Sequence, residues 1–122
     1  MSISDLLEQH FGAPAGDHLL ALPDGEAVGR EGFRGWRLEP VIGGPHTFTA
    51  YLGVDGTVVL FQRSVLGEVW SRWLSLADAQ RDFTRTAASH KAMGTTAAPG
   101  WCAVRDRVAA VRAAVGDGGP AA

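Results

Sequence analysis

The chain has 122 residues, of which 46% are apolar and 20% are charged, and its formal net charge is −2. This length suits one domain with its own hydrophobic core, and the composition excludes a disordered or fibrous protein. The charge balance lacks the basic excess of a nucleic-acid-binding protein, and the single cysteine, Cys102, excludes an internal disulfide or a zinc site built on cysteine pairs.

The first residues do not resemble a secretory signal, because Asp5, Glu8 and His10 interrupt the apolar positions and basic residues are missing from the start. No apolar run in the sequence approaches the roughly 20 residues of a membrane-spanning helix. We therefore expect a cytoplasmic protein that does not bind a membrane.

Residues 3–11 have the apolar spacing of an amphipathic helix. Ser2 and Asp5 have the spacing of a capping box, and Gly12 suits the end of the helix. The following stretch, 13–32, contains several Pro and Gly residues and is compatible with two interpretations. One is a short strand at 18–22, and the other is a single helical turn.

The sequence signal then changes to that of β-strands. Apolar and charged residues alternate from 33 to 39, which predicts a half-exposed strand. The runs 47–54 and 57–64 flank Asp55-Gly56, a pair typical of a two-residue type I′ hairpin turn. This turn predicts a core face made of Phe48, Ala50, Leu52, Val54, Val59 and Phe61, and a reverse face with Tyr51, Val58 and Leu60.

Residues 66–74 fit either a helical stripe or a strand. Gly67 would weaken a helix at its start, and Ser75 with Asp78 resembles the cap of a new helix, so the strand is favoured. Helices are then predicted from 76 to about 90 and from 99 to 115, with apolar stripes at Leu76, Ala79, Phe83 and Ala87 and at Trp101, Val104, Val108, Val111 and Val115.

Together these elements predict an α+β fold: an antiparallel meander of three to five strands, with an N-terminal helix and two C-terminal helices packed mainly on one face. We expect a single domain over residues 1–115 and a mobile tail over 116–122.

Cys102 is the strongest candidate for a reactive group, because it lies near the start of a predicted helix, where a thiolate is favoured. His90 or His46 would then act as its base. The simpler interpretation is a small apolar residue at the edge of the core. No metal-ligand spacing, phosphate-binding loop or nucleophile elbow is present, so we predict no cofactor and favour a non-enzyme.

Trp70 and Trp73 are three residues apart, which on a strand places their rings on opposite faces of the sheet. The ring on the outer face, with Tyr51 and Leu60 nearby, would be typical of a protein-binding surface, unless an N-terminal segment covers it.

The leading hypothesis is a non-catalytic protein-binding module, of a bacterial accessory, immunity-like or chaperone-like kind. Its partner would be another protein or a second copy of the chain. The alternative is a small-molecule-binding or enzymatic domain whose pocket is lined by Trp36, Tyr51, Trp70 or Trp73, with Cys102 inside.

Overall fold

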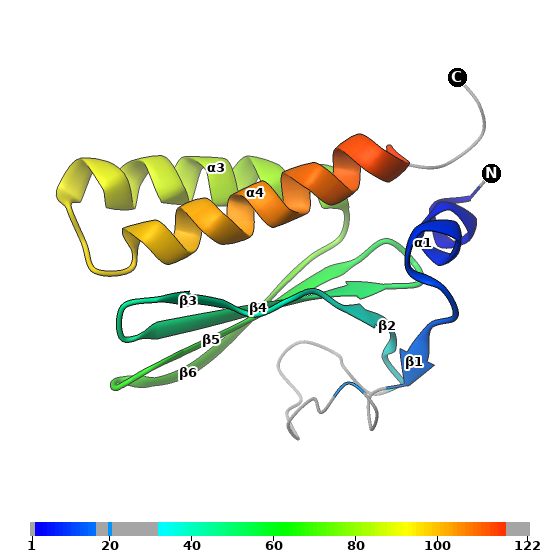
Figure 1. Ribbon diagram of the computed structural model, residues 1–122, viewed down its shortest axis with the longest axis horizontal. Helices are drawn as coiled ribbons and strands as arrows, with labels where there is room; N and C mark the ends of the chain where they lie inside the picture. The colour runs from blue at the N-terminus through cyan, green and yellow to red at the C-terminus, as the bar shows by residue number, and fades with distance from the viewer. Residues whose placement is uncertain (1, 17–19, 21–31, 117–122) are drawn as a thin grey trace.

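The computed structural model describes residues 2–16, 20 and 32–116, and it places two long helices over one face of an antiparallel sheet (Figure 1). The predicted tail lies outside the described residues except for Gly116, and so does the stretch 18–22 except for Leu20. None of the described helices is both long and apolar enough to cross a membrane.

The first helix, α1 (Ile3–Phe11), begins and ends where the sequence predicts. The Ser2 hydroxyl accepts a hydrogen bond from the Asp5 N–H at 3.2 Å, and the Asp5 carboxylate accepts one from the Ser2 N–H at 3.4 Å. The capping box is therefore confirmed. Leu7 is fully buried in the core, which anchors the helix to the rest of the domain.

Within the described residues the sheet contains six strands: β1 (Ala15–Gly16), β2 (Arg34–Arg37), β3 (Val41–Gly43), β4 (His46–Gly53), β5 (Val58–Ser64) and β6 (Gly67–Trp73). Their order is β1-β2-β4-β5-β6, and β3 pairs with the start of β4. The α+β class is confirmed, and so is a strand at 67–73. The strand number exceeds the predicted range because β1 and β3 are short and lack a clear alternating pattern.

The β4–β5 hairpin corrects the prediction of a two-residue turn. The Gly53 N–H donates to the Thr57 carbonyl at 2.8 Å, and the Gly56 N–H donates to the Gly53 carbonyl at 2.9 Å. These bonds leave a three-residue loop, 54–56, whose last residue, Gly56, has a φ of 87°. A turn followed by a glycine at positive φ is the usual three-residue hairpin connection.

The longer loop shifts β5 by one residue against β4, so that Leu52 pairs with Val58 and Ala50 with Leu60. Because side chains alternate along a strand, this shift exchanges the two faces of β5. Val58 and Leu60 lie in the core beneath the helices, whereas Val59 and Phe61 lie on the opposite face, the reverse of the prediction. The predicted facing of β4 is confirmed.

The two C-terminal helices, α3 (Leu76–Met93) and α4 (Ala98–Val115), lie side by side over the sheet (Figure 1). Ser75 caps the start of α3. The helix ends at Met93, three residues beyond the expected end, and Gly94 is its C-cap. Every residue of the two predicted stripes is buried. The start of α4 lies against β3, where a Cβ on Gly43 would come within 2.6 Å of the Gly100 nitrogen.

Candidate functional site

The face of the sheet opposite the helices carries a row of aromatic rings, which we call the outer cluster. The Trp70 ring stacks on Phe61 from the neighbouring strand, with centroids 4.5 Å apart, and on Tyr51, with centroids 6.1 Å apart. Phe33 meets Tyr51 edge to face at 6.5 Å. The cluster is completed by Ala15, Leu20 and Val59.

One half of the outer cluster is covered and the other half is open. Tyr51 and Val59 are 4% and 1% exposed and pack with Leu20, so this half is closed within the chain. Phe61 and Trp70 are only partly buried. The open half is therefore the part of the sheet at which another molecule can contact large aromatic surface.

Burial raises the pKa of the Tyr51 phenol, and the charge of Arg37 opposes that shift. The phenol therefore stays protonated at neutral pH. Tyr51 serves the outer cluster as a packed ring and is unsuited to act as a base.

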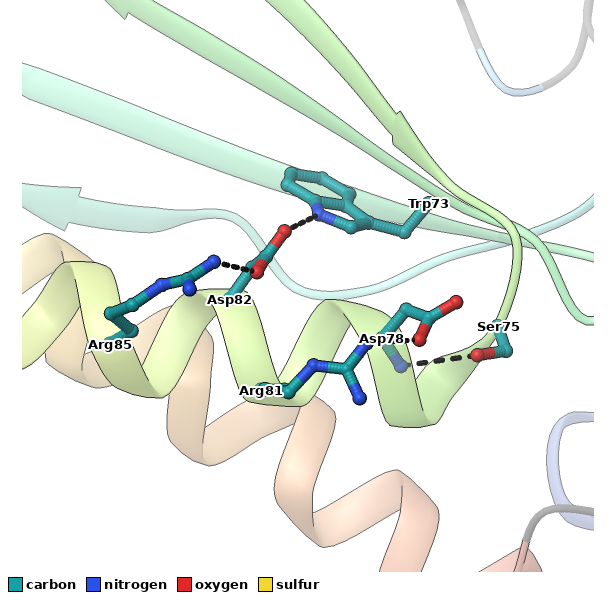
Figure 2. Close-up of polar contacts among 6 residues, drawn as sticks. All are labelled: Trp73, Ser75, Asp78, Arg81, Asp82 and Arg85. Carbon is teal, nitrogen blue, oxygen red and sulfur yellow. Dashed lines mark hydrogen bonds and ion pairs between the residues drawn. The ribbon is translucent and has the colours of Figure 1, made fainter.

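Three of the five predicted binding residues lie on the helix side instead. Leu60 is fully buried, and Trp36 donates from Nε1 to the Gly12 carbonyl at 2.9 Å. Trp73 donates from Nε1 to the Asp82 carboxylate at 2.7 Å (Figure 2). Its ring also packs edge to face on Phe83. Trp73 thus joins β6 to α3. The prediction that Trp70 and Trp73 lie on opposite faces is confirmed.

Asp82 and Asp78 hold the start of α3 through a small set of polar contacts (Figure 2). Asp82 also accepts from Arg85 at 2.6 Å, and Asp78 bonds Arg81 one turn earlier. Both arginines are largely exposed, so these ion pairs contribute little to stability. These contacts therefore join β6 to α3, and both carboxylates are paired with arginines.

The described residues do not form the cysteine–histidine pair that the reactive-thiol hypothesis requires. Cys102 is partly buried against the core, and among the described residues neither His90 nor His46 forms a hydrogen bond with it. His90 bonds the Thr95 hydroxyl at 2.6 Å, and its ring stacks on Trp101. His46 bonds the Thr96 hydroxyl at 3.0 Å. Both histidines therefore hold the loop between α3 and α4.

A second feature, a groove between α1, the end of β2 and α4, was not apparent from the sequence. It has a volume of about 270 Å³ and brings together Phe11, Arg37, Glu39 and Arg107. The Arg107 Nε atom is buried and has no hydrogen-bond partner among the described residues. These positions are far apart in the chain, so no local pattern could have joined them.

Within the described part of the chain, no group of three or more His, Cys, Asp or Glu side chains is arranged to hold a metal ion. Comparison with family models, curated proteins and solved structures found no match to this chain.

Proposed function

We propose that the chain is a non-catalytic protein-binding module that uses the open half of the outer cluster, Phe61 and Trp70, to bind another protein or a second copy of itself. One observation carries the proposal: Trp70 is partly exposed on the face that the helices leave uncovered. Trp and Tyr dominate the binding free energy of protein interfaces because they bury large apolar areas.

The surroundings of Trp70 support this role. Its ring stacks on Phe61 and contacts Tyr51, so little side-chain entropy is lost when a partner binds. Exposed charged residues flank the ring on the same strand, Glu68 on one side and Arg72 on the other. An apolar centre with a charged rim is the usual composition of a protein interface.

The alternative, a pocket that combines the aromatic residues with Cys102, has less support. Trp36, Trp73 and Cys102 lie on the helix side of the sheet, and Tyr51 and Trp70 lie on the other side. A single pocket lined by both groups would have to pass through the sheet. Size, acidity and the lack of a catalytic constellation among the described residues favour a bacterial accessory protein of the cytoplasm, immunity-like or chaperone-like.

The test is affinity capture from a lysate of the source organism, followed by mass spectrometry. Trp70→Ala and Phe61→Ala should each reduce capture of the specific partner about tenfold or more. Met93→Ala is the matched control, because Met93 is 66% exposed on α3 and lies away from the outer cluster. Capture that is undiminished in the folded Trp70→Ala variant would refute the proposal.

A further inference from the structure

The described sheet ends at β6, which pairs with β5 on one side only. The bond from Gly53 to Thr57 shows that the odd-numbered residues of β5 direct their backbone polar groups toward β4. The even-numbered residues of β5 therefore bond β6, through its residues 67, 69, 71 and 73. Glu68, Trp70 and Arg72 consequently direct their N–H and C=O groups outward, at the open edge of the sheet.

The two charged residues of this edge lie at equal distances along the strand from Trp70. Glu68 and Arg72 lie two residues to either side of it, and all three side chains share the outer face. If a second β6 strand runs antiparallel with Trp70 opposite Trp70, each Glu68 lies opposite an Arg72 of the other strand. The three residues with outward backbone groups then all find hydrogen-bond partners in the same register.

Two exposed leucines follow the same symmetry. Leu66 is 94% exposed in the β5–β6 turn, and Leu74 is 73% exposed just after β6. They lie four residues to either side of Trp70, so the register that pairs the charges also brings Leu66 of one copy beside Leu74 of the other. Exposed apolar side chains of this size are otherwise unfavourable at the two ends of an edge strand.

Edge strands are usually protected from such pairing by proline, bulges or charged side chains, and charges of opposite sign protect least when they can pair across a two-fold axis. β6 has no proline, and its two charged side chains have opposite signs. In the chain, Glu68 forms an exposed ion pair with Arg63 at 3.3 Å. That pair is weak and leaves Glu68 free to interact with a second arginine.

We propose that a second copy of this chain pairs with β6 antiparallel about a two-fold axis at Trp70, which joins the two sheets into one continuous sheet. This inference goes beyond the proposed function, because it names a partner that binds next to the outer cluster and not on it. The contact itself is made by the edge of β6. The two outer clusters then lie side by side on one face of the dimer, where they form a single larger binding surface.

The test uses charge exchange, with mass measured by light scattering or sedimentation. Each cross-strand pair joins position 68 of one copy to position 72 of the other. The variant Glu68→Arg places two arginines in each pair, and the variant Arg72→Glu places two glutamates there. Each variant should raise the dimer Kd about tenfold or more. An equimolar mixture of the two variants, and the double variant Glu68→Arg/Arg72→Glu, restore opposite charges and should restore the dimer.

Arg81→Glu, on the exposed surface of α3, is the control for a change in net charge and should leave the dimer intact. A wild-type chain that stays monomeric at millimolar concentration would overturn the inference, and so would a dimer that both single variants leave unchanged. Failure of the mixture to dimerise, with both variants folded, would overturn the register.

The Phe61→Ala variant separates this inference from the proposed function. Phe61 lies one strand in from the edge, so Phe61→Ala should reduce partner capture and preserve the dimer. A dimer that forms as predicted while Phe61→Ala leaves capture unchanged would refute the role of the outer face alone. Capture that depends on Phe61 in a chain that never dimerises would refute the edge pairing alone.

Discussion

The carboxylate of Asp55 accepts two hydrogen bonds from Thr57, one from its N–H at 3.1 Å and one from its hydroxyl at 2.7 Å. Burial acts to raise the pKa of this carboxyl, but these bonds, its own N–H and the charge of Arg72 outweigh burial and lower the pKa. Since the folded-state pKa lies below the unfolded one, the ionised carboxylate stabilises the fold above about pH 4. That contribution is lost as the pH falls through the lowered folded-state pKa.

We predict that Asp55→Ala lowers the free energy of unfolding by about 1 kcal/mol at pH 7, because both bonds to Thr57 are lost. The difference from wild type should shrink at about pH 3, below the ordinary pKa of the carboxyl, because the unfolded state there binds the proton more readily than the folded state. Urea denaturation at the two pH values measures both effects. Asp106→Ala, at a side chain that is 69% exposed, should change stability little. An equal loss at both pH values would show that the charge of Asp55 does not contribute.

At the scale of the elements, the contact between α4 and the β3–β4 hairpin depends on two glycines. Gly43 and Gly100 let the backbones of β3 and α4 approach closely, and a Cβ on Gly100 would overlap the Phe48 ring. Phe48 in turn packs edge to face on Trp101, with centroids 5.2 Å apart. Close backbone approach is thus the condition for burying two aromatic rings beneath the helix.

Helix propensity alone predicts that Gly100→Ala stabilises the protein, whereas we expect the substitution to destabilise it. Alanine is preferred to glycine inside a helix by about 1 kcal/mol, but overlap with Phe48 should make the substitution destabilising by about 1–3 kcal/mol. Thermal or urea denaturation measures the sign directly. Ser89→Ala, at an exposed position of α3, is the control for a propensity effect alone. A stability gain in Gly100→Ala would contradict the packing of α4 on Phe48.

At the scale of the whole molecule, the sheet separates a large core beneath the helices from the smaller outer cluster. The large core joins residues from α1, the central strands, α3 and α4. The helices α3 and α4 lie above the sheet in Figure 1. The outer cluster has no helix of the C-terminal pair over it. This asymmetry places most of the buried apolar side chains on the helix face and leaves Phe61 and Trp70 of the outer face only partly buried.

The register of β5 against β4 makes a quantitative prediction about these two layers. Leu60 is fully buried in the large core, so Leu60→Ala should cost about 2–5 kcal/mol. Phe61 has the larger side chain but is only partly buried, so Phe61→Ala should cost less. Denaturant unfolding of the two variants under one condition gives the comparison. The opposite order of losses would support the two-residue turn instead.

The sequence alone determined the features that depend on local chemistry and periodicity. The capping box at Ser2, the buried stripes of α3 and α4 and the opposite facing of Trp70 and Trp73 follow from spacing along one element. Helix and strand periods are properties of the backbone, so a local pattern is enough to assign a face. The α+β class follows from the order of those elements.

Only the tertiary structure decided the register of β5 and the composition of the outer cluster. Asp55-Gly56 is compatible with a two-residue or a three-residue loop, and the Val54 N–H resolves the choice by bonding the distant Arg34 carbonyl at 2.9 Å. That bond ties Val54 to the β2 side and lengthens the hairpin loop. As a result Phe61 lies on the outer face and Leu60 lies in the core, the reverse of the faces predicted from the sequence. A register depends on partners far along the chain, which a local pattern does not contain.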